Sequence, residues 1–227
     1  AEKLIRLGNT RDDFHQLEDC DWVAEAVVER LDIKQALYRQ LNDVCKGTTI
    51  ITSNTSTIPI SLLTKGMPKK FCERFAITHF FNPVRFMRLL ELVRGEFTRE
   101  DVINTLDMFS ETMLGKGVVS CSDTPGFLAN RVGVFAIQCA LYKAFKYKLS
   151  PTEADAFFGR PLGLPKTGVF GLYDLIGIDL MADVVKSLVS ILPENDAFHK
   201  YSSPIEFMTT MIANGQTGNK NEKGFYK

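Results

Sequence analysis

Apolar positions in the first half of the chain follow two alternating spacings. Short apolar runs are separated by segments in which apolar side chains recur every three or four residues, as in the stripe of Leu31, Leu37 and Leu41. The first spacing is typical of β-strands and the second of α-helices. Strands are predicted at 3–7, 21–28, 48–52, 75–81, 86–93 and 117–121, and helices at 10–17, at 31–45, from 59 onward and at 99–114. This alternation indicates a parallel sheet covered by helices.

The second half shows only the helical spacing. A boundary at 123–126 precedes the segment 127–147, which is apolar over a wide arc and is expected to be a central helix buried on several sides. The run Ser150-Pro151-Thr152-Glu153 predicts a capping box with proline at the first helical position. Further helices are predicted at 172–176, 180–192 and 205–213, with loops at 159–171 and 215–224. The pattern therefore predicts an α/β domain, 1–122, followed by an all-α domain, 123–227.

A histidine and a glutamate lie on either side of an interruption between two predicted strands. His79 lies near the end of the run 75–81, Asn82-Pro83 interrupts the pattern, and the next apolar run contains Glu91. Two strands that meet at such an interruption can bring the two side chains into contact. A carboxylate beside an imidazole fixes its tautomer and raises its basicity, which suits a general base. His79 and Glu91 are therefore candidate catalytic residues, although each position is also ordinary for its residue type.

A run of hydroxyl and amide side chains, 53–57, follows the predicted strand at 48–52 and precedes a predicted helix. Such side chains cap helices and contact ligands. In open parallel sheets, ligands bind beyond the carboxyl ends of the strands, which is also where 79–82 is expected to lie. We therefore expect the two segments to converge on one site.

The composition narrows the possible functions. The chain has 227 residues, 45% of them hydrophobic, and a formal net charge of zero, so nucleic acid is not an expected partner. Five scattered cysteines without a Cys-x-x-Cys motif suggest neither disulfides nor a metal site, and they favour a reducing, cytoplasmic compartment. No apolar run has the length of a membrane span and no signal-peptide pattern is present, so no membrane association is expected.

Five motifs, taken in order, resemble those of 3-hydroxyacyl-CoA dehydrogenases. They are Glu25-Ala26-Val27-Val28-Glu29, Ser53-Asn54-Thr55-Ser56, His79-Phe80-Phe81-Asn82-Pro83 with Glu91, Asp123-Thr124-Pro125-Gly126-Phe127 with Asn130-Arg131, and the ending Gly224-Phe225-Tyr226-Lys227. Each is weak by itself, but their order over nearly the whole chain argues against chance. The resemblance implies a partial Rossmann-type sheet followed by a C-terminal helical domain, the layout that the hydrophobic pattern also predicts.

The resemblance implies a catalytic role for four residues. His79 would be the general base that takes the proton of the substrate's 3-hydroxyl group, and Glu91 would orient it and stabilise the imidazolium. Ser56 would hydrogen-bond the reacting oxygen, and Asn130 would position the substrate near its thioester. Ser56 and Asn130 also suit helix caps, so a structural reading stays open for both.

The same resemblance implies NAD as the cofactor and no metal. Ser56 and Asn82 match positions at the nicotinamide end, Glu29 and Lys34 match positions near the cofactor, and Lys220 matches one in the terminal loop. Glu29 and Lys34 also suit ordinary surface charges at the start of a helix. Lys220 equally suits a solvated lysine in a polar loop.

One departure from the family pattern is large. The family begins with a strand, a Gly-x-Gly-x-x-Gly turn and a helix that bind the pyrophosphate of NAD, followed by an acidic residue on the ribose. No Gly-x-Gly-x-x-Gly occurs in the sequence, which predicts that the chain enters this domain partway and lacks its first mononucleotide-binding half. A second departure is the loop 161–168, which is closer to bacterial, multifunctional-type relatives than to mitochondrial enzymes.

The sequence therefore predicts an NAD-dependent enzyme that oxidises 3-hydroxyacyl-CoA to 3-oxoacyl-CoA in fatty-acid β-oxidation, here as a fragment expected to be inactive alone. The expected partners are an acyl-CoA substrate and a second copy of the chain, because the apolar helix at 127–147 needs cover. The alternatives are a non-catalytic assembly domain of a larger protein and another β-hydroxyacid oxidoreductase.

Overall fold

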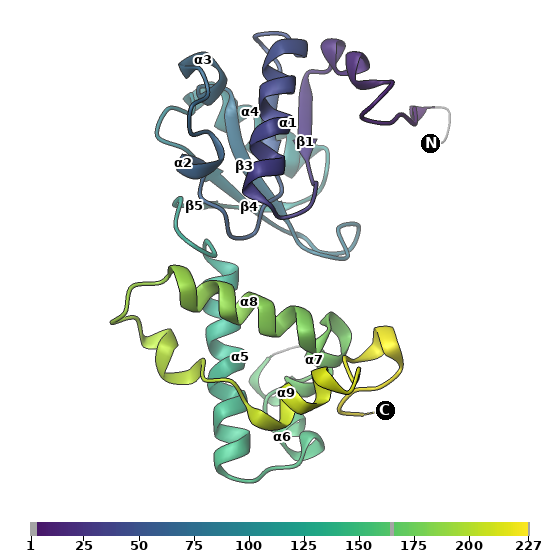
Figure 1. Ribbon diagram of the computed structural model, residues 1–227, viewed down its shortest axis with the longest axis vertical. Helices are drawn as coiled ribbons and strands as arrows, with labels where there is room; N and C mark the ends of the chain where they lie inside the picture. The colour runs from purple at the N-terminus through teal and green to yellow at the C-terminus, as the bar shows by residue number, and fades with distance from the viewer. Residues whose placement is uncertain (1–3, 164–165, 227) are drawn as a thin grey trace. The chain divides into compact units, whose positions relative to one another are not determined.

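A computed structural model describes residues 4–163 and 166–226. The chain divides into two compact units, one that ends at Leu128 and one that begins at Ala129 (Figure 1). The first unit is an α/β structure and the second is helical. Within the described ranges, no helix combines the length and the apolar character that are needed to cross a membrane.

A five-stranded sheet forms the centre of the first unit. Its strands are β1 (Trp22–Glu25), β2 (Ile50–Ser53), β3 (Phe75–Phe80), β4 (Leu89–Arg94) and β5 (Gly117–Cys121), and they lie side by side in that order. All neighbours are parallel except β3 and β4, which are antiparallel. The prediction of a parallel sheet is thus confirmed for three pairings and wrong for the fourth. A short connection that contains a cis Asn82-Pro83 bond returns the chain beside β3, whereas a parallel neighbour needs a longer crossover.

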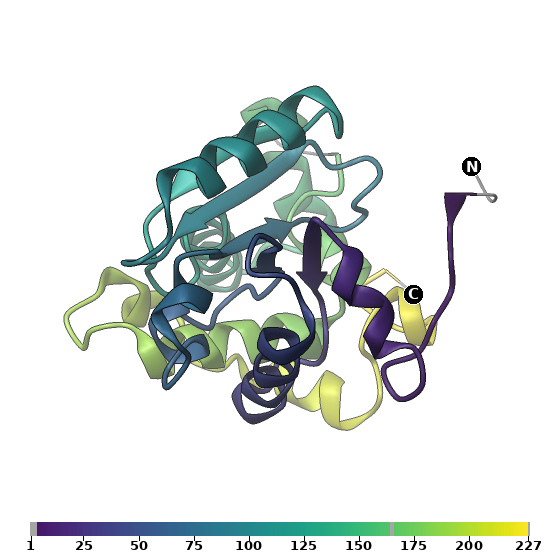
Figure 2. The same ribbon diagram turned by 90° about the horizontal axis from the view of Figure 1, so that it is seen from above.

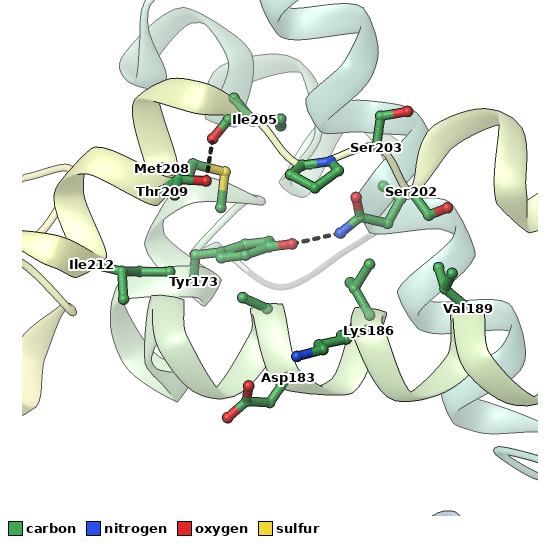
Figure 3. Close-up of a pocket in the computed structure, with 14 residues that line it drawn as sticks. Tyr173, Asp183, Lys186, Val189, Ser202, Ser203, Ile205, Met208, Thr209 and Ile212 are labelled. Carbon is green, nitrogen blue, oxygen red and sulfur yellow. Dashed lines mark hydrogen bonds between the residues drawn. The ribbon is translucent and has the colours of Figure 1, made fainter.

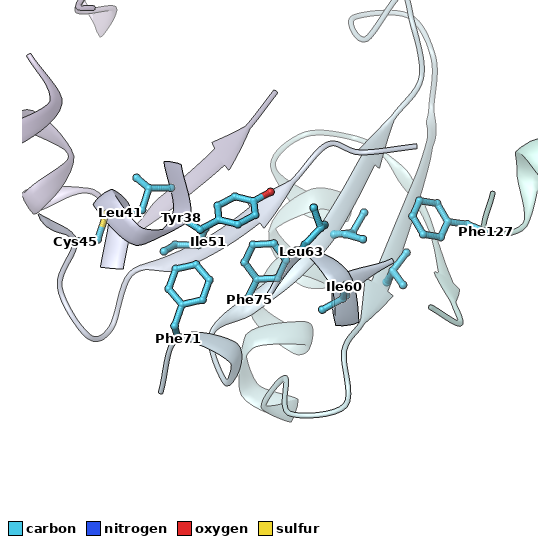
Figure 4. Close-up of a cluster of buried hydrophobic side chains, with 11 residues drawn as sticks. Tyr38, Leu41, Cys45, Ile51, Ile60, Leu63, Phe71, Phe75 and Phe127 are labelled. Atoms are coloured by element: carbon cyan, nitrogen blue, oxygen red, sulfur yellow. The ribbon is translucent and has the colours of Figure 1, made fainter. Parts of the chain in front are cut away.

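Helices cover both faces of this sheet (Figure 2). They are α1 (Leu31–Val44), α2 (Ile60–Leu63), α3 (Lys69–Cys72) and α4 (Glu100–Thr112). Phe75 and Ile77 of β3 pack in one cluster with Tyr38 of α1 (Figure 4), while Ala76 packs in another with Leu106 of α4. Because successive strand side chains point to opposite faces, α1 and α4 lie on opposite sides of the sheet.

The second unit is built from five helices within the described ranges. They are α5 (Ala129–Lys146), α6 (Pro151–Phe157), α7 (Phe170–Ile176), α8 (Ile178–Ile191) and α9 (Glu206–Ala213), with 3-10 turns η3 (Arg160–Leu162), η4 (Ala197–Tyr201) and η5 (Asn219–Asn221). The predicted capping box is present at the start of α6: Ser150 Oγ accepts from the Glu153 N–H, and the Glu153 carboxylate accepts from the Ser150 N–H at 2.9 Å. Leu141, Tyr173 and Met181 belong to the core of this unit.

Some details of the predicted elements are wrong. Residues 4–7 form no strand, and the helix predicted at 10–17 is a 3-10 helix, η2 (Phe14–Asp19), that follows Asp13. Leu4 and Leu7 are each 91% exposed, so no packing fixes an extended conformation there. The helix α5 is buried on one side but leaves Val132 and Tyr142 exposed. Lys3, 164–165 and Lys227, which belong to a predicted strand, a loop and a motif, lie outside the described residues.

Candidate active site

His79 and Glu91 face each other across β3 and β4. The antiparallel register pairs them directly, and His79 Nδ1 lies 2.6 Å from Glu91 Oε2. Both are buried, with exposed fractions of 6% for His79 and 0% for Glu91. An ionised carboxylate can only accept, so Nδ1 carries the proton of this bond and Nε2 is the free basic nitrogen of the neutral ring. The pair therefore has the geometry of a general base with an orienting carboxylate.

The second oxygen of Glu91 is held by residues at and beyond β5. The Leu128 N–H donates to Glu91 Oε1 at 2.9 Å, and the Cys121 thiol lies 3.7 Å from the same oxygen. Burial, followed by the charge of Glu91, raises the pKa of Cys121 to about 11, so the thiol stays protonated at neutral pH. These contacts hold the carboxylate in the orientation that presents Oε2 to His79.

Two aromatic rings flank the imidazole of His79. The ring centroid of Phe81 lies 4.4 Å from that of His79, and the centroid of Phe127 lies 5.8 Å from it. Phe127 is 4% exposed and belongs to the apolar cluster on this face of the sheet. The rings limit the access of water to the imidazole, which strengthens its hydrogen bond to Glu91.

A second buried polar cluster is centred on Glu25 at the carboxyl end of β1. Glu25 Oε1 accepts from Lys34 Nζ at 2.7 Å, and Oε2 accepts from Tyr38 at 2.6 Å and from Ser53 at 2.7 Å. Burial pushes the pKa of Glu25 upward, but the hydrogen bonds from these three donors outweigh it and leave the pKa below its ordinary value. Burial and the bond to Glu25 together raise the pKa of Tyr38. The carboxylate is therefore ionised, and protein donors take the place of water around both of its oxygens.

Lys34 connects this cluster to Glu29. Its side chain is 1% exposed, and Nζ lies 3.2 Å from Glu29 Oε2 and 3.4 Å from a main-chain carbonyl oxygen, in addition to its bond to Glu25. Glu29 Oε1 in turn accepts from the run 55–57, through two hydroxyl groups and the Ser56 N–H. The structure thus brings Glu29, Lys34 and Ser56 together. All three donors of Lys34 therefore have protein partners. Its contact with Glu29 also supports the run 55–57, because Glu29 accepts hydrogen bonds from that run.

The other predicted residues lie elsewhere. Asn82 is exposed just after β3, and Asn54 Oδ1 accepts from the Phe80 N–H at 2.9 Å, which ties the run 53–57 to the end of β3. In the second unit, Asn130 is half-buried in the first turn of α5, and Lys220 Nζ pairs with Asp179 Oδ2 at 2.5 Å. Their contacts with substrate and cofactor stay predictions.

Sequence reasoning missed Glu25 and Phe127 as parts of these clusters. A signal was present for Glu25, because it lies two residues after Val23 in β1 and so shares the core-facing side of the strand. No local sequence pattern predicts the contact between Phe127 and His79, because the two residues are far apart in the chain.

The helical unit holds a cavity of about 400 Å³ (Figure 3). It is lined by α5, α7, α8 and the segment 202–212, and Asp183 and Lys186 of α8 are among its lining residues. Gln138 Nε2 donates to the Tyr173 hydroxyl at 2.6 Å beside it, and this buried bond links α5 to α7. The volume is in the range of small-molecule sites.

Comparison with known proteins agrees with this architecture. Residues 1–124 match the family model described as "3-hydroxyacyl-CoA dehydrogenase, NAD binding domain", and residues 126–227 match the one for its C-terminal domain. The FadB2 crystal structure from M. tuberculosis superimposes with a TM-score of 0.84 at 31% identity, over 95% of this chain and 73% of that chain.

Two curated relatives cover almost the whole chain. The "Putative fatty acid oxidation complex trifunctional enzyme" of Rickettsia prowazekii is 43% identical over 99% of this chain and 31% of its own length. The "Probable 3-hydroxyacyl-CoA dehydrogenase" of Deinococcus radiodurans is 40% identical over 99% of this chain and 64% of its own length. The chain thus spans less than two thirds of each relative. With both domain models matched in order, the chain belongs to the 3-hydroxyacyl-CoA dehydrogenase family.

Proposed function

We propose that the chain provides the catalytic base and part of the cofactor site of an NAD-dependent enzyme that oxidises 3-hydroxyacyl-CoA to 3-oxoacyl-CoA in fatty-acid β-oxidation. The observation that carries this proposal is the buried His79–Glu91 pair, with 2.6 Å between Nδ1 and Oε2. A buried carboxylate that fixes the imidazole tautomer leaves Nε2 as the base, which is the group that removal of a hydroxyl proton requires.

The reaction moves one proton and one hydride. NAD, when bound, supplies the hydride acceptor. His79 Nε2 takes the proton of the 3-hydroxyl group while the C3–H electron pair leaves as hydride and the C3–O bond becomes a carbonyl. Glu91 compensates the positive charge that forms on the imidazole. In this scheme Ser56 hydrogen-bonds the reacting oxygen, and Asn130 positions the substrate near its thioester.

The residues that follow β1, β2 and β3 suit the nicotinamide end of NAD. Asn54, Ser56 and Thr57 lie beyond the end of β2 and are half-buried, and Asn82 lies beyond the end of β3 and is exposed. Glu29 anchors the run at 55–57, and Lys34 holds Glu29 in place. We assign Ser56 and Asn82 to direct contacts, Glu29 and Lys34 to the support of this edge, and Lys220 to a contact from the terminal loop.

The proposal is tested by the replacement of His79 with glutamine in the complete gene product. His79→Gln removes the base but keeps a polar side chain, so we expect turnover of NAD with a 3-hydroxyacyl-CoA to fall by about 100- to 10,000-fold. NAD affinity, measured by calorimetry, should change little.

The matched control is His199→Gln, which changes a half-buried histidine of the helical unit whose Nε2 bonds the Pro193 carbonyl oxygen. This variant should keep full turnover. If His79→Gln were as active as His199→Gln, the assignment of the base would be wrong.

We also propose that the protein works in the cytoplasm as a homodimer formed by the helical unit. All five cysteines lie within the described ranges and are free thiols there, which supports a reducing compartment. Three large apolar side chains of the helical unit gather around one surface cavity while remaining more than 60% exposed, which supports an interface there: Tyr147, Phe157 and Leu162.

A further inference from the structure

The turn formed by residues 126–128 adopts a conformation that suits glycine and strains phenylalanine. Gly126 has φ +73° and Phe127 has φ +47°, both in the left-handed region. A bulky side chain is rare there, because its Cβ crowds the backbone. Residues persist in such conformations when surrounding contacts compensate for the strain, and these residues cluster at functional sites.

The contacts of this turn reach both members of the His79–Glu91 pair. The Phe127 ring packs beside the imidazole at 5.8 Å, and the next residue, Leu128, donates its N–H to Glu91 Oε1 at 2.9 Å. The same two backbone angles thus place a ring on the base and a donor on its partner. A relaxed turn would lose the alignment of both groups at once.

We propose that Phe127 is a positioning residue for the base, and that the turn 126–128 is a clasp on the His79–Glu91 pair. The ring fills the space into which the imidazole would otherwise rotate, and it keeps water from the bond between Nδ1 and Oε2. The Leu128 N–H donates to Oε1, and Oε2 faces His79 Nδ1. The expected effect of this turn on turnover rests on the proposed function, whereas its effect on the His79–Glu91 hydrogen bond does not.

The clasp is tested by NMR on the 227-residue chain, without substrate or cofactor. The chain has three histidines, so His79→Gln identifies the Nδ1 proton signal of His79 by its loss. In Phe127→Leu, which keeps an apolar side chain but removes the ring, exchange of this proton with water should become faster by about tenfold. Phe127→Tyr, which restores the ring, should return the exchange rate to near that of the parent.

The matched control is Phe71→Leu. Phe71 is fully buried in the same cluster as Phe127, but its ring contacts are with Tyr38 and Phe75 (Figure 4). This variant should lower stability as a core substitution does, yet leave the exchange of the His79 proton unchanged. Equal effects of Phe71→Leu and Phe127→Leu would show a general loss of stability and overturn the clasp.

Kinetics on the complete gene product separate positioning from binding. Phe127→Leu should lower kcat by about tenfold with KM for NAD within about twofold, because the ring acts on the base and not on the cofactor. Unchanged kcat together with unchanged proton exchange would overturn the inference. If His79→Gln kept full turnover while Phe127→Leu still accelerated exchange, the proposed function would fail and the clasp would stand.

Discussion

Glu25 shows what the burial of a single charged residue requires. Its side chain and that of Lys34 are each 1% exposed. The Glu25 carboxylate accepts hydrogen bonds from the Lys34 ammonium group and from the hydroxyl groups of Tyr38 and Ser53. Transfer of both charges out of water is costly, and the pair persists because each charge is the main partner of the other. The cluster therefore fixes the relative positions of β1, α1 and the end of β2.

Replacement of Glu25 by glutamine should reveal how the charge of Glu25 makes the free energy of unfolding depend on pH. At neutral pH, Glu25→Gln leaves the buried Lys34 without its nearest anion, and the free energy of unfolding should fall by about 3–5 kcal/mol. The folded pKa of Glu25 is below the ordinary value of 4.5, so its contribution is fully present above that value and is lost as pH falls through the folded pKa. Urea unfolding at several pH values should therefore show the difference between parent and variant shrinking below about pH 4.5.

The control for this measurement is Glu96→Gln, which changes an exposed glutamate of the same unit. Its stability should run parallel to that of the parent at every pH. A gap between parent and Glu25→Gln that stays constant into the acid range would mean that the carboxylate charge is not what stabilises the cluster.

At the scale of the secondary-structure elements, helix α6 begins with a complete capping box. Ser150 and Glu153 exchange hydrogen bonds with each other's backbone N–H groups, and Pro151 occupies the first turn. The helix is only seven residues long, and Ala154 is its one buried residue within the described ranges. A short helix with so little buried surface depends strongly on its cap.

Loss of the cap should therefore be measurable. Ser150→Ala removes the acceptor for the Glu153 N–H, and we expect it to lower the free energy of unfolding by about 1 kcal/mol. Ser122→Ala, at an exposed position between β5 and α5, should have almost no effect in the same thermal or urea unfolding experiment. If the two alanine variants were equally stable, α6 would be held by packing alone.

For the whole molecule, the exposed apolar patch of Tyr147, Phe157 and Leu162 bears on assembly. Phe157→Asp places a charge in the proposed interface and should convert a dimer into a monomer. Light scattering at tens of micromolar, roughly the range in which domains associate, is the measurement. Met108→Asp, an exposed apolar position of α4, should leave the dimer intact. A parent protein that is already monomeric under these conditions would contradict the proposal.

The affinity for NAD is a second property of the whole molecule for which the sequence makes a prediction. The 227 residues contain no Gly-x-Gly-x-x-Gly motif, so we expect this polypeptide to lack the backbone contacts to the pyrophosphate of NAD that such a turn provides. Two charge-assisted hydrogen bonds of roughly 1.5–3 kcal/mol each correspond to at least about a 100-fold loss of affinity. Calorimetric titration of the 227-residue chain with NAD should therefore show binding that is weaker by this factor than in a protein that contains the glycine-rich half. Equal affinity would mean that other residues hold the cofactor.

Local pattern alone determined much of this protein. The stripe in α1, the run that becomes β5 and the capping box of α6 were predictable, because helical spacing, strand composition and capping act over a few residues. It was also predictable that His79 and Glu91 could meet, because an interruption joins the two runs that carry them, but the antiparallel register that pairs them was not.

Only the tertiary structure decided the rest. The antiparallel pairing of β3 with β4, the burial of Lys34 and the ring of Phe127 beside His79 depend on which segments lie side by side. Glu25 meets Ser53 through the register of β1 and β2, 28 positions apart, and Glu91 meets Leu128 across 37 positions. Such contacts are set by packing, since the burial of apolar surface fixes how strands and helices assemble, and no local sequence pattern encodes them.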